Sequence, residues 1–135
     1  MRVAGVNVLA VLLAAVAIYA LGFLTYGLLI DPVRYMASDG ITQAAHDAVG
    51  DSRMAYGVVM PLMTAAFLGV LFSWANVCGL VTGIKWGAMV AFASAIPGVG
   101  YDWVYGVGDC YAPLIDSAYM LVTHVVAGAI LASWK

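Results

Sequence analysis

Charged residues are scarce in this chain. Only 9% of its 135 residues are charged and 65% are hydrophobic, whereas a soluble domain has about 25% charged and about 45–50% apolar residues. The formal net charge is −2 and no basic run occurs, which excludes the electrostatic surface that nucleic-acid-binding proteins need. We therefore expect a protein that lies in the lipid bilayer and has no nucleic-acid partner.

Cysteine is nearly absent as well, since the chain has only Cys78 and Cys110. The hydropathy pattern places Cys78 at the inner end of the second membrane span and Cys110 in an outer loop, about 30 Å of hydrocarbon apart. A disulfide needs Cα atoms within about 7 Å. We therefore expect two free thiols, of which Cys110 can in principle pair between subunits.

Recognisable catalytic and metal-binding motifs are also missing. The sequence has no zinc-ligand spacing, no phosphate-binding loop and no nucleophile elbow. Asp47 and Asp51 beside His46 make a weak metal pattern, for which a solvated helix face is the better interpretation. We predict no catalytic residues and no metal site.

Long apolar runs are what the chain does contain. No charge occurs between Arg2 and Asp31, and about 20 apolar residues suffice to cross the hydrocarbon. A secretory signal also begins with a basic residue and an apolar run, but this run is long for one. The chain is therefore predicted to be one all-α domain over residues 1–135, a four-transmembrane-helix antiparallel bundle with spans at about 3–30, 55–78, 86–107 and 113–134.

Three connections join these spans. Short loops, "GLVTGIK" and "GVGDCYAP", follow the second and third spans, which makes those helices antiparallel neighbours. The longer stretch from Asp31 to Arg53 begins with Asp31 and Pro32, which end the first span. Within it, a short interfacial helix is expected, with Ser38, Asp39 or Thr42 as its cap.

The basic residues give an orientation. Arg2, Lys85 and Lys135 fall on one side of the membrane, whereas Arg34 and Arg53 share the other side with most of the aspartates. Because lysine and arginine are enriched on the cytoplasmic side, we expect both termini in the cytoplasm. The expected location is the inner (plasma) membrane of a bacterium.

Small residues recur at helical spacing in every span, which allows close contact between helices in lipid. These contacts lie within the chain, between copies of it, or with other membrane proteins. The repeating positions are Ala10, Ala14 and Ala17; Ala65, Gly69, Ser73 and Asn76; Gly87, Ala91, Ser94 and Gly98; and Gly128 and Ala132.

Two aspartates lie inside predicted spans, at the depth of their outer third. An aspartate at the centre of a membrane helix costs about 2.5–3.5 kcal/mol, so Asp102 and Asp116 are expected to have polar partners. We predict an outer-side polar cluster, either functional or serving only to lock the helices together. Its members are Asp102, Asp116, Arg53, Tyr26, Tyr119 and Arg34. An aromatic belt at headgroup depth is the better explanation for Trp86, Trp103 and Trp134.

The third span contains a predicted helix break. Pro97 removes an amide donor, and Gly98 and Gly100 loosen the backbone beyond it. Such a break exposes carbonyl groups in some transporters. A plain packing kink is the simpler alternative.

His124 lies near the middle of the fourth span. Ala127 and Gly128 one turn later would leave room for a macrocycle, so haem or chlorophyll ligation is one interpretation. A neutral histidine that is hydrogen-bonded to a neighbouring helix is the other.

The segments "LAVLLAAVAIYALGFLTYGLLI" and "LIDSAYMLVTHVVAGAILASW" resemble a bacterial membrane family, domain-of-unknown-function family 1761. The resemblance covers nearly the whole chain and rests on Tyr26, Gly27, Ile115, Asp116, Tyr119 and Trp134. It implies a four-helix membrane protein and adds weight to Tyr26, Asp116 and Tyr119. It implies no activity and says nothing of His124.

Three functions remain open at this point. The first is a non-enzymatic membrane subunit that self-associates or accompanies other membrane proteins. The second is a small-solute or proton permeation protein that uses Asp102, Asp116 and the break at Pro97. The third is a haem- or pigment-binding protein that uses His124.

Overall fold

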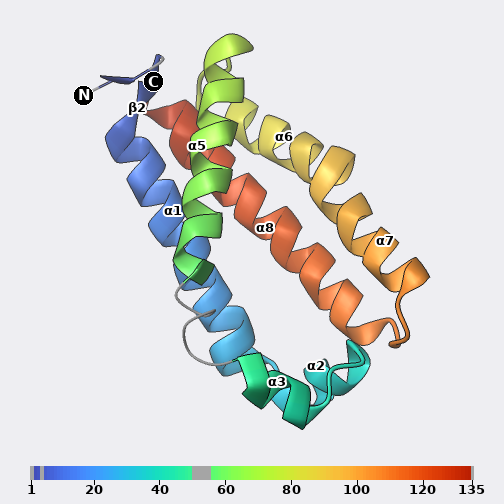
Figure 1. The fold of residues 1–135 in the computed structure, drawn as a ribbon. Helices are drawn as coiled ribbons and strands as arrows, with labels where there is room; N and C mark the ends of the chain where they lie inside the picture. The colour runs from blue at the N-terminus through green and yellow to red at the C-terminus, as the bar shows by residue number, and fades with distance from the viewer. Residues whose placement is uncertain (1, 4, 50–55, 135) are drawn as a thin grey trace.

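The computed structural model describes residues 2–3, 5–49 and 56–134, and long helices dominate it (Figure 1). Four helical segments are long and apolar enough to cross a membrane, namely Val8–Leu29, Tyr56–Trp74, Leu80–Tyr105 and Tyr111–Ser133. They confirm the predicted four-helix membrane architecture. The marked chain ends lie at one end of the molecule, and the short helices α2 and α3 lie at the opposite end (Figure 1).

The first segment consists of an α-helix that widens into a π-helix. Helix α1 spans Val8–Gly22, and Asn7 caps it by accepting a hydrogen bond from the Leu9 amide at 3.1 Å. The π-helix η1 continues it over Phe23–Leu29. Ahead of the helix, strands β1 (Arg2–Val3) and β2 (Val6–Asn7) pair antiparallel.

The connection between the first two membrane segments folds into two short helices where the sequence predicted one. Helix α2 spans Pro32–Ser38 and α3 spans Gln43–Val49. Asp31 caps α2 by accepting from the Val33 amide, while Thr42 accepts from the Ala45 amide at the start of α3. Gly40, with φ of +72°, adopts the left-handed conformation that separates the two helices.

The third membrane segment starts earlier than predicted. The 3₁₀ turn η2 (Tyr56–Val58) and α5 (Val59–Trp74) form the second segment. The third comprises α6 (Leu80–Val90), the π-helix η3 (Ala91–Ala95) and α7 (Ile96–Tyr105). The prediction that "GLVTGIK" is a loop and that the span begins at Trp86 is therefore wrong.

Backbone geometry and one lysine explain that error. The turn is completed before Leu80, at Asn76 (φ 54°) and Gly79 (φ 87°), which both adopt left-handed conformations. Lys85 lies on α6 with its side chain exposed. A lysine near the end of a membrane helix extends its long side chain toward the headgroups, so its charge does not mark the end of the helix.

Helix α8 (Tyr111–Ser133) is central to the packing, because α1, α5, α6, α7 and α2 all contact it. The approach of α6 to α8 is close: a Cβ atom on Gly83 would collide with the Gly128 carbonyl oxygen. A Cβ atom on Gly87 would likewise collide with the His124 carbonyl oxygen. Several members of the predicted small-residue faces are buried, namely Ala10, Ala14, Ala65, Gly69, Gly87, Ala91, Gly128 and Ala132.

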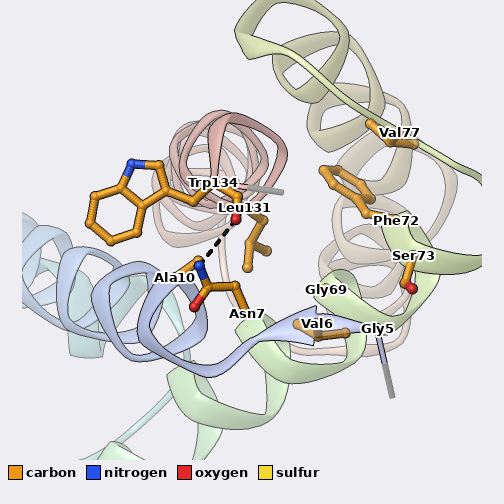
Figure 2. Close-up of a pocket in the computed structure, with 10 residues that line it drawn as sticks. All are labelled: Gly5, Val6, Asn7, Ala10, Gly69, Phe72, Ser73, Val77, Leu131 and Trp134. Atoms are coloured by element: carbon orange, nitrogen blue, oxygen red, sulfur yellow. Dashed lines mark hydrogen bonds between the residues drawn. The ribbon is translucent and has the colours of Figure 1, made fainter. Parts of the chain in front are cut away.

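Asn7 and Trp134 lie close together, as Figure 2 shows. The Asn7 side-chain amide donates to the Trp134 carbonyl oxygen at 3.1 Å, which ties β2 to the end of α8. Beside this bond lies a cavity of ≈ 20 Å³ lined by residues of β2, α1, α5 and α8, room for about one water molecule. The rings of Phe72 and Trp86, 6.5 Å apart, bring α5 against α6 nearby. Cys78 and Cys110 are free, as predicted, and both are exposed.

Candidate functional site

The Asp116 carboxylate accepts hydrogen bonds from two phenols toward the end of the fold where α2 lies. The Tyr26 hydroxyl donates to its Oδ1 at 2.6 Å, and the Tyr35 hydroxyl lies 2.8 Å from both carboxylate oxygens. These contacts join η1, α2 and α8. Hydrogen bonds to a charged group are stronger than neutral ones, so they offset part of the cost of placing the aspartate at this depth.

Tyr26 reaches this position from the π-helix η1, whose i→i+5 pairing turns side chains away from their α-helical directions. Its ring meets the Tyr35 ring edge-on at 5.5 Å between centroids and the Tyr119 ring at 5.2 Å. The Tyr119 hydroxyl donates to the Ile18 carbonyl oxygen at 3.3 Å. Tyr119 therefore supports the ring of Tyr26 and at the same time ties α8 to α1.

A second set of contacts holds α2 against the loop before α8. The buried Ser38 hydroxyl donates to Asp109 and accepts from the Ala112 amide at 2.8 Å. Asp109 also accepts from the Tyr111 amide at 2.8 Å. The Ser38 hydroxyl, this amide and the nearby Arg34 guanidinium lower the pKa of Asp109 below its ordinary value.

Between α2, α7 and α8 lies a cavity of ≈ 190 Å³. Four of the residues that line it are aspartates: Asp39, Asp102, Asp109 and Asp116. The other lining residues are Ser38, Val99, Trp103, Gly106, Val107, Gly108 and Pro113, so no lysine or arginine is among them in the described part of the chain. Burial and the charges of Asp116 and Asp102 raise the pKa of Asp39.

The structure brings several members of the predicted polar cluster together. Asp102 and Asp116 line the same cavity, and Tyr26 and Tyr119 belong to the network around Asp116. Arg34 instead lies over the Tyr111 ring, 4.1 Å from its centroid. Arg53 lies outside the described residues.

Tyr35 is the partner that the sequence analysis missed. It lies on α2, three residues before Ser38, so both side chains share the face that contacts α8. The available signal was the cap formed by Asp31 and Pro32, which predicts a helix starting there. That helix makes Tyr35 and Ser38 neighbours one turn apart.

The segment around Pro97 stays helical. The wider π turn η3 ends directly before Ile96 and Pro97, which accommodates the amide that proline lacks. Gly98 and Gly100 lie within α7, and a Cβ atom on either would meet nothing within 4 Å. Their neighbour Val99 lines the acidic cavity.

His124 is buried between α8 and α6. Its Nδ1 donates to the Met120 carbonyl oxygen at 2.7 Å, since a carbonyl can only accept. The space beside Gly128 that could admit a macrocycle is filled by the backbone of Gly83. Among the described residues, no group of three or more histidine, cysteine or acidic side chains could hold a metal ion. His46 and Asp47 form an exposed pair at 3.5 Å on α3, and Asp51 is not described.

Comparison with known families gives one match. A family model described as "Protein of unknown function (DUF1761)" matches residues 9–132. No curated protein and no solved structure matches the chain. The matched range includes α2, α7 and α8, and with them every residue of the Asp116 network and the acidic cavity.

Proposed function

We propose a function for this chain, which belongs to the DUF1761 family of proteins of unknown function. It is a multi-pass membrane protein, and its proposed role is that of a non-enzymatic subunit that associates with further copies of itself in the membrane. Association with other membrane proteins is the related possibility. Its outer polar cluster holds the fold together in this proposal.

The observation that carries this proposal is the division between polar and apolar groups. Asp102 lines the acidic cavity, and three other groups at or near the spans resemble catalytic side chains: Asp116, Asp109 and His124. Each of them is hydrogen-bonded within the chain. The outward faces of the spans, by contrast, are broad and apolar, with large exposed side chains such as Phe67 and Phe92. Such faces contact lipid or other helices.

Helices α6 and α7 leave much of their surface uncovered. They pack chiefly against α8, while α1 and α5 also pack against each other. Ser94 and Gly98 lie exposed on this segment, one turn apart, and let a second helix approach closely. We propose this face as the contact between copies.

The test is the oligomeric state in lipid. Fluorescently labelled protein is diluted in liposomes over a range of protein-to-lipid ratios, and subunits are counted by single-molecule photobleaching. We expect dimers or larger assemblies whose population falls with dilution, and a roughly tenfold weaker association for Gly98→Ile. Phe92→Leu, an exposed apolar exchange on the same segment, is the matched control. Monomers at every ratio would contradict the proposal.

The proposed location is the plasma membrane of a bacterium, with both termini in the cytoplasm. Support comes from Arg2 and Lys85 near the end that carries the termini, and from the acidic cavity at the other end. Reactivity of Cys78 and Cys110 toward an impermeant maleimide tests this in whole cells. Cys110 is expected to react from outside, and Cys78 only after the membrane is opened.

The acidic cavity favours a second candidate function, permeation of a small cationic solute or of protons. Four carboxylates from α2, α7, α8 and the loop between the last two line one cavity, and none of the described lining residues is basic. One chain offers little room for a pathway, so this function would need the oligomer proposed above.

Flux measurements in proteoliposomes separate the two functions. If permeation is correct, Asp102→Asn and Asp116→Asn each reduce proton or cation flux, whereas Asp47→Asn on the exposed face of α3 does not. Unchanged flux in both cavity variants, together with preserved association, would reject permeation and retain the subunit role.

A further inference from the structure

Helix α2 is a short segment between two non-helical turns. On one side, Ile30 is extended (φ −111°, ψ 138°) and Asp31 begins the helix. On the other side, Gly40 has φ of +72°. Because the extended Ile30 ends the helical conformation before α2 and Gly40 ends it after α2, α2 can rotate about these two turns as a unit while α1 remains intact.

Little apolar burial holds α2 in place. Ser38 is its one buried residue, and Val33 is 67% exposed. A segment with few buried apolar contacts has a low free energy of local opening. Apart from the edge-on contact of the Tyr35 ring with Tyr26, the position of α2 therefore depends on its polar contacts.

Those polar contacts all reach the outer end of α8 and the loop before it. Tyr35 donates to both oxygens of Asp116, and Ser38 donates to Asp109 and accepts from the Ala112 amide. Arg34 adds a cation–π contact with Tyr111. Two hydroxyl groups on α2 thus donate to two carboxylates, one on α8 and one in the loop before it.

Helix α2 also forms one wall of the acidic cavity. Ser38 and Asp39 line it on the α2 side, while Asp102 and Trp103 line it on α7. Asp39, Asp102 and Asp109 are already exposed, whereas Val99 and Asp116 are half-buried. Movement of α2 away from α8 removes this wall and exposes Val99 and Asp116 to the water outside the membrane. We propose that α2 is a hinged lid over the acidic cavity, latched by Tyr35 on Asp116 and by Ser38 on Asp109.

The charges around the lid oppose the latch. Asp39 at the end of α2 faces the carboxylates of Asp102, Asp109 and Asp116 across the cavity. The negative charges of carboxylates that line one cavity repel one another. Arg34 provides the compensating cation on α2 itself. The hydroxyl bonds and the repulsion act in opposite directions, so loss of the latch favours the open lid.

Cysteine accessibility tests the lid. Cys78 and Cys110 are replaced by serine, and Val99, which lines the cavity, is replaced by cysteine in protein reconstituted in nanodiscs. The rate of reaction with an impermeant maleimide is then measured. We expect Tyr35→Phe combined with Ser38→Ala to raise this rate about tenfold, and Tyr101→Phe, which alters an exposed phenol on α7, to leave it unchanged.

A second reporter distinguishes lid opening from general loosening. Ala44 lies exposed on α3 outside the cavity. The rate at which Ala44→Cys reacts with the maleimide should be the same with and without the latch substitutions. The lid is overturned by a Val99→Cys rate that the latch variants leave unchanged, or by an equal rise at both reporters. Hydrogen exchange of the intact protein gives an independent check, since α2 amides must exchange faster than those in the middle of α8. Equal protection would also overturn the lid. These readouts do not depend on self-association, so either proposal can fail alone.

Discussion

The backbones of Gly83 and Gly128 lie in direct contact where α6 meets α8. A Cβ atom on either glycine would overlap the carbonyl oxygen of the other. Lipid provides no hydrophobic driving force between helices, so van der Waals contact at such small residues supplies much of the attraction. The attachment of α6 to the rest of the fold therefore depends on these positions.

Replacement of Gly83 by alanine is expected to lower the free energy of unfolding by about 1–3 kcal/mol, because the backbones must separate. Gly98→Ala is the matched control, since a Cβ atom there meets nothing within 4 Å. The control should be neutral or stabilising by up to about 1 kcal/mol. Steric trapping in bicelles measures the free energy of unfolding of both variants. Equal decreases for Gly83→Ala and Gly98→Ala would contradict the close contact at Gly83.

The two phenols on Asp116 should be energetically coupled. Tyr26→Phe and Tyr35→Phe are each expected to lower the free energy of unfolding by roughly 0.5–2 kcal/mol. Both hydroxyls donate to the same carboxylate, so the double variant should deviate from the sum by at least about 0.5 kcal/mol. A cycle that pairs Tyr26 with the exposed Tyr101 should be additive. Additivity in the first cycle would show that the two bonds act independently.

Acid should weaken the contact between α2 and the loop before α8. The pKa of Asp109 is lowered from 3.8, so its contribution is present above that pH and is lost as the pH falls through the folded value. The pKa of Asp39 is raised from 3.8; its contribution is therefore complete below that pH and is lost as the pH rises through its folded value.

Two asparagine variants separate these opposite effects. Protection of α2 amides, measured by hydrogen exchange with correction for the intrinsic rate at each pH, is the readout. Asp109→Asn should abolish the loss of α2 amide protection at acid pH, and Asp39→Asn should abolish the loss of protection at higher pH. An acid loss that persists in Asp109→Asn would exclude its carboxylate as the source.

His124 is expected to bind no added haem. The Nδ1 bond to the Met120 carbonyl leaves Nε2 free, but the backbone of α6 fills the space beside Gly128 that a macrocycle would need. Titration of hemin into detergent-solubilised protein should give the same visible spectrum for the wild type, His124→Leu and His46→Leu. A Soret band that only His124→Leu abolishes would restore the ligand interpretation.

The sequence was sufficient for features that depend on hydropathy and depth. The length of the apolar runs predicted the four spans. The cost of a carboxylate in lipid indicated that Asp116 needs polar partners, and Tyr26 was one of the predicted partners. Tyr35 was not found because its contact depends on how the connection between the first two membrane segments folds back onto α8, and periodicity along a single helix carries no such information. Gly83 was missed for another reason: Lys85 ended the apolar run, although its exposed side chain allows α6 to continue past it.

Helix α8 contacts each of the other long helices, yet it is the last of the four to leave the ribosome. Until then α1 and α5 can pair, whereas α6 and α7 enter the bilayer without the partner that their glycines fit. In a nascent chain that stalls before Tyr111, α6 and α7 therefore lack the helix against which they pack. Membrane chaperones bind such intermediates, and quality-control proteases degrade them. Completion of the fold therefore depends on the insertion of α8.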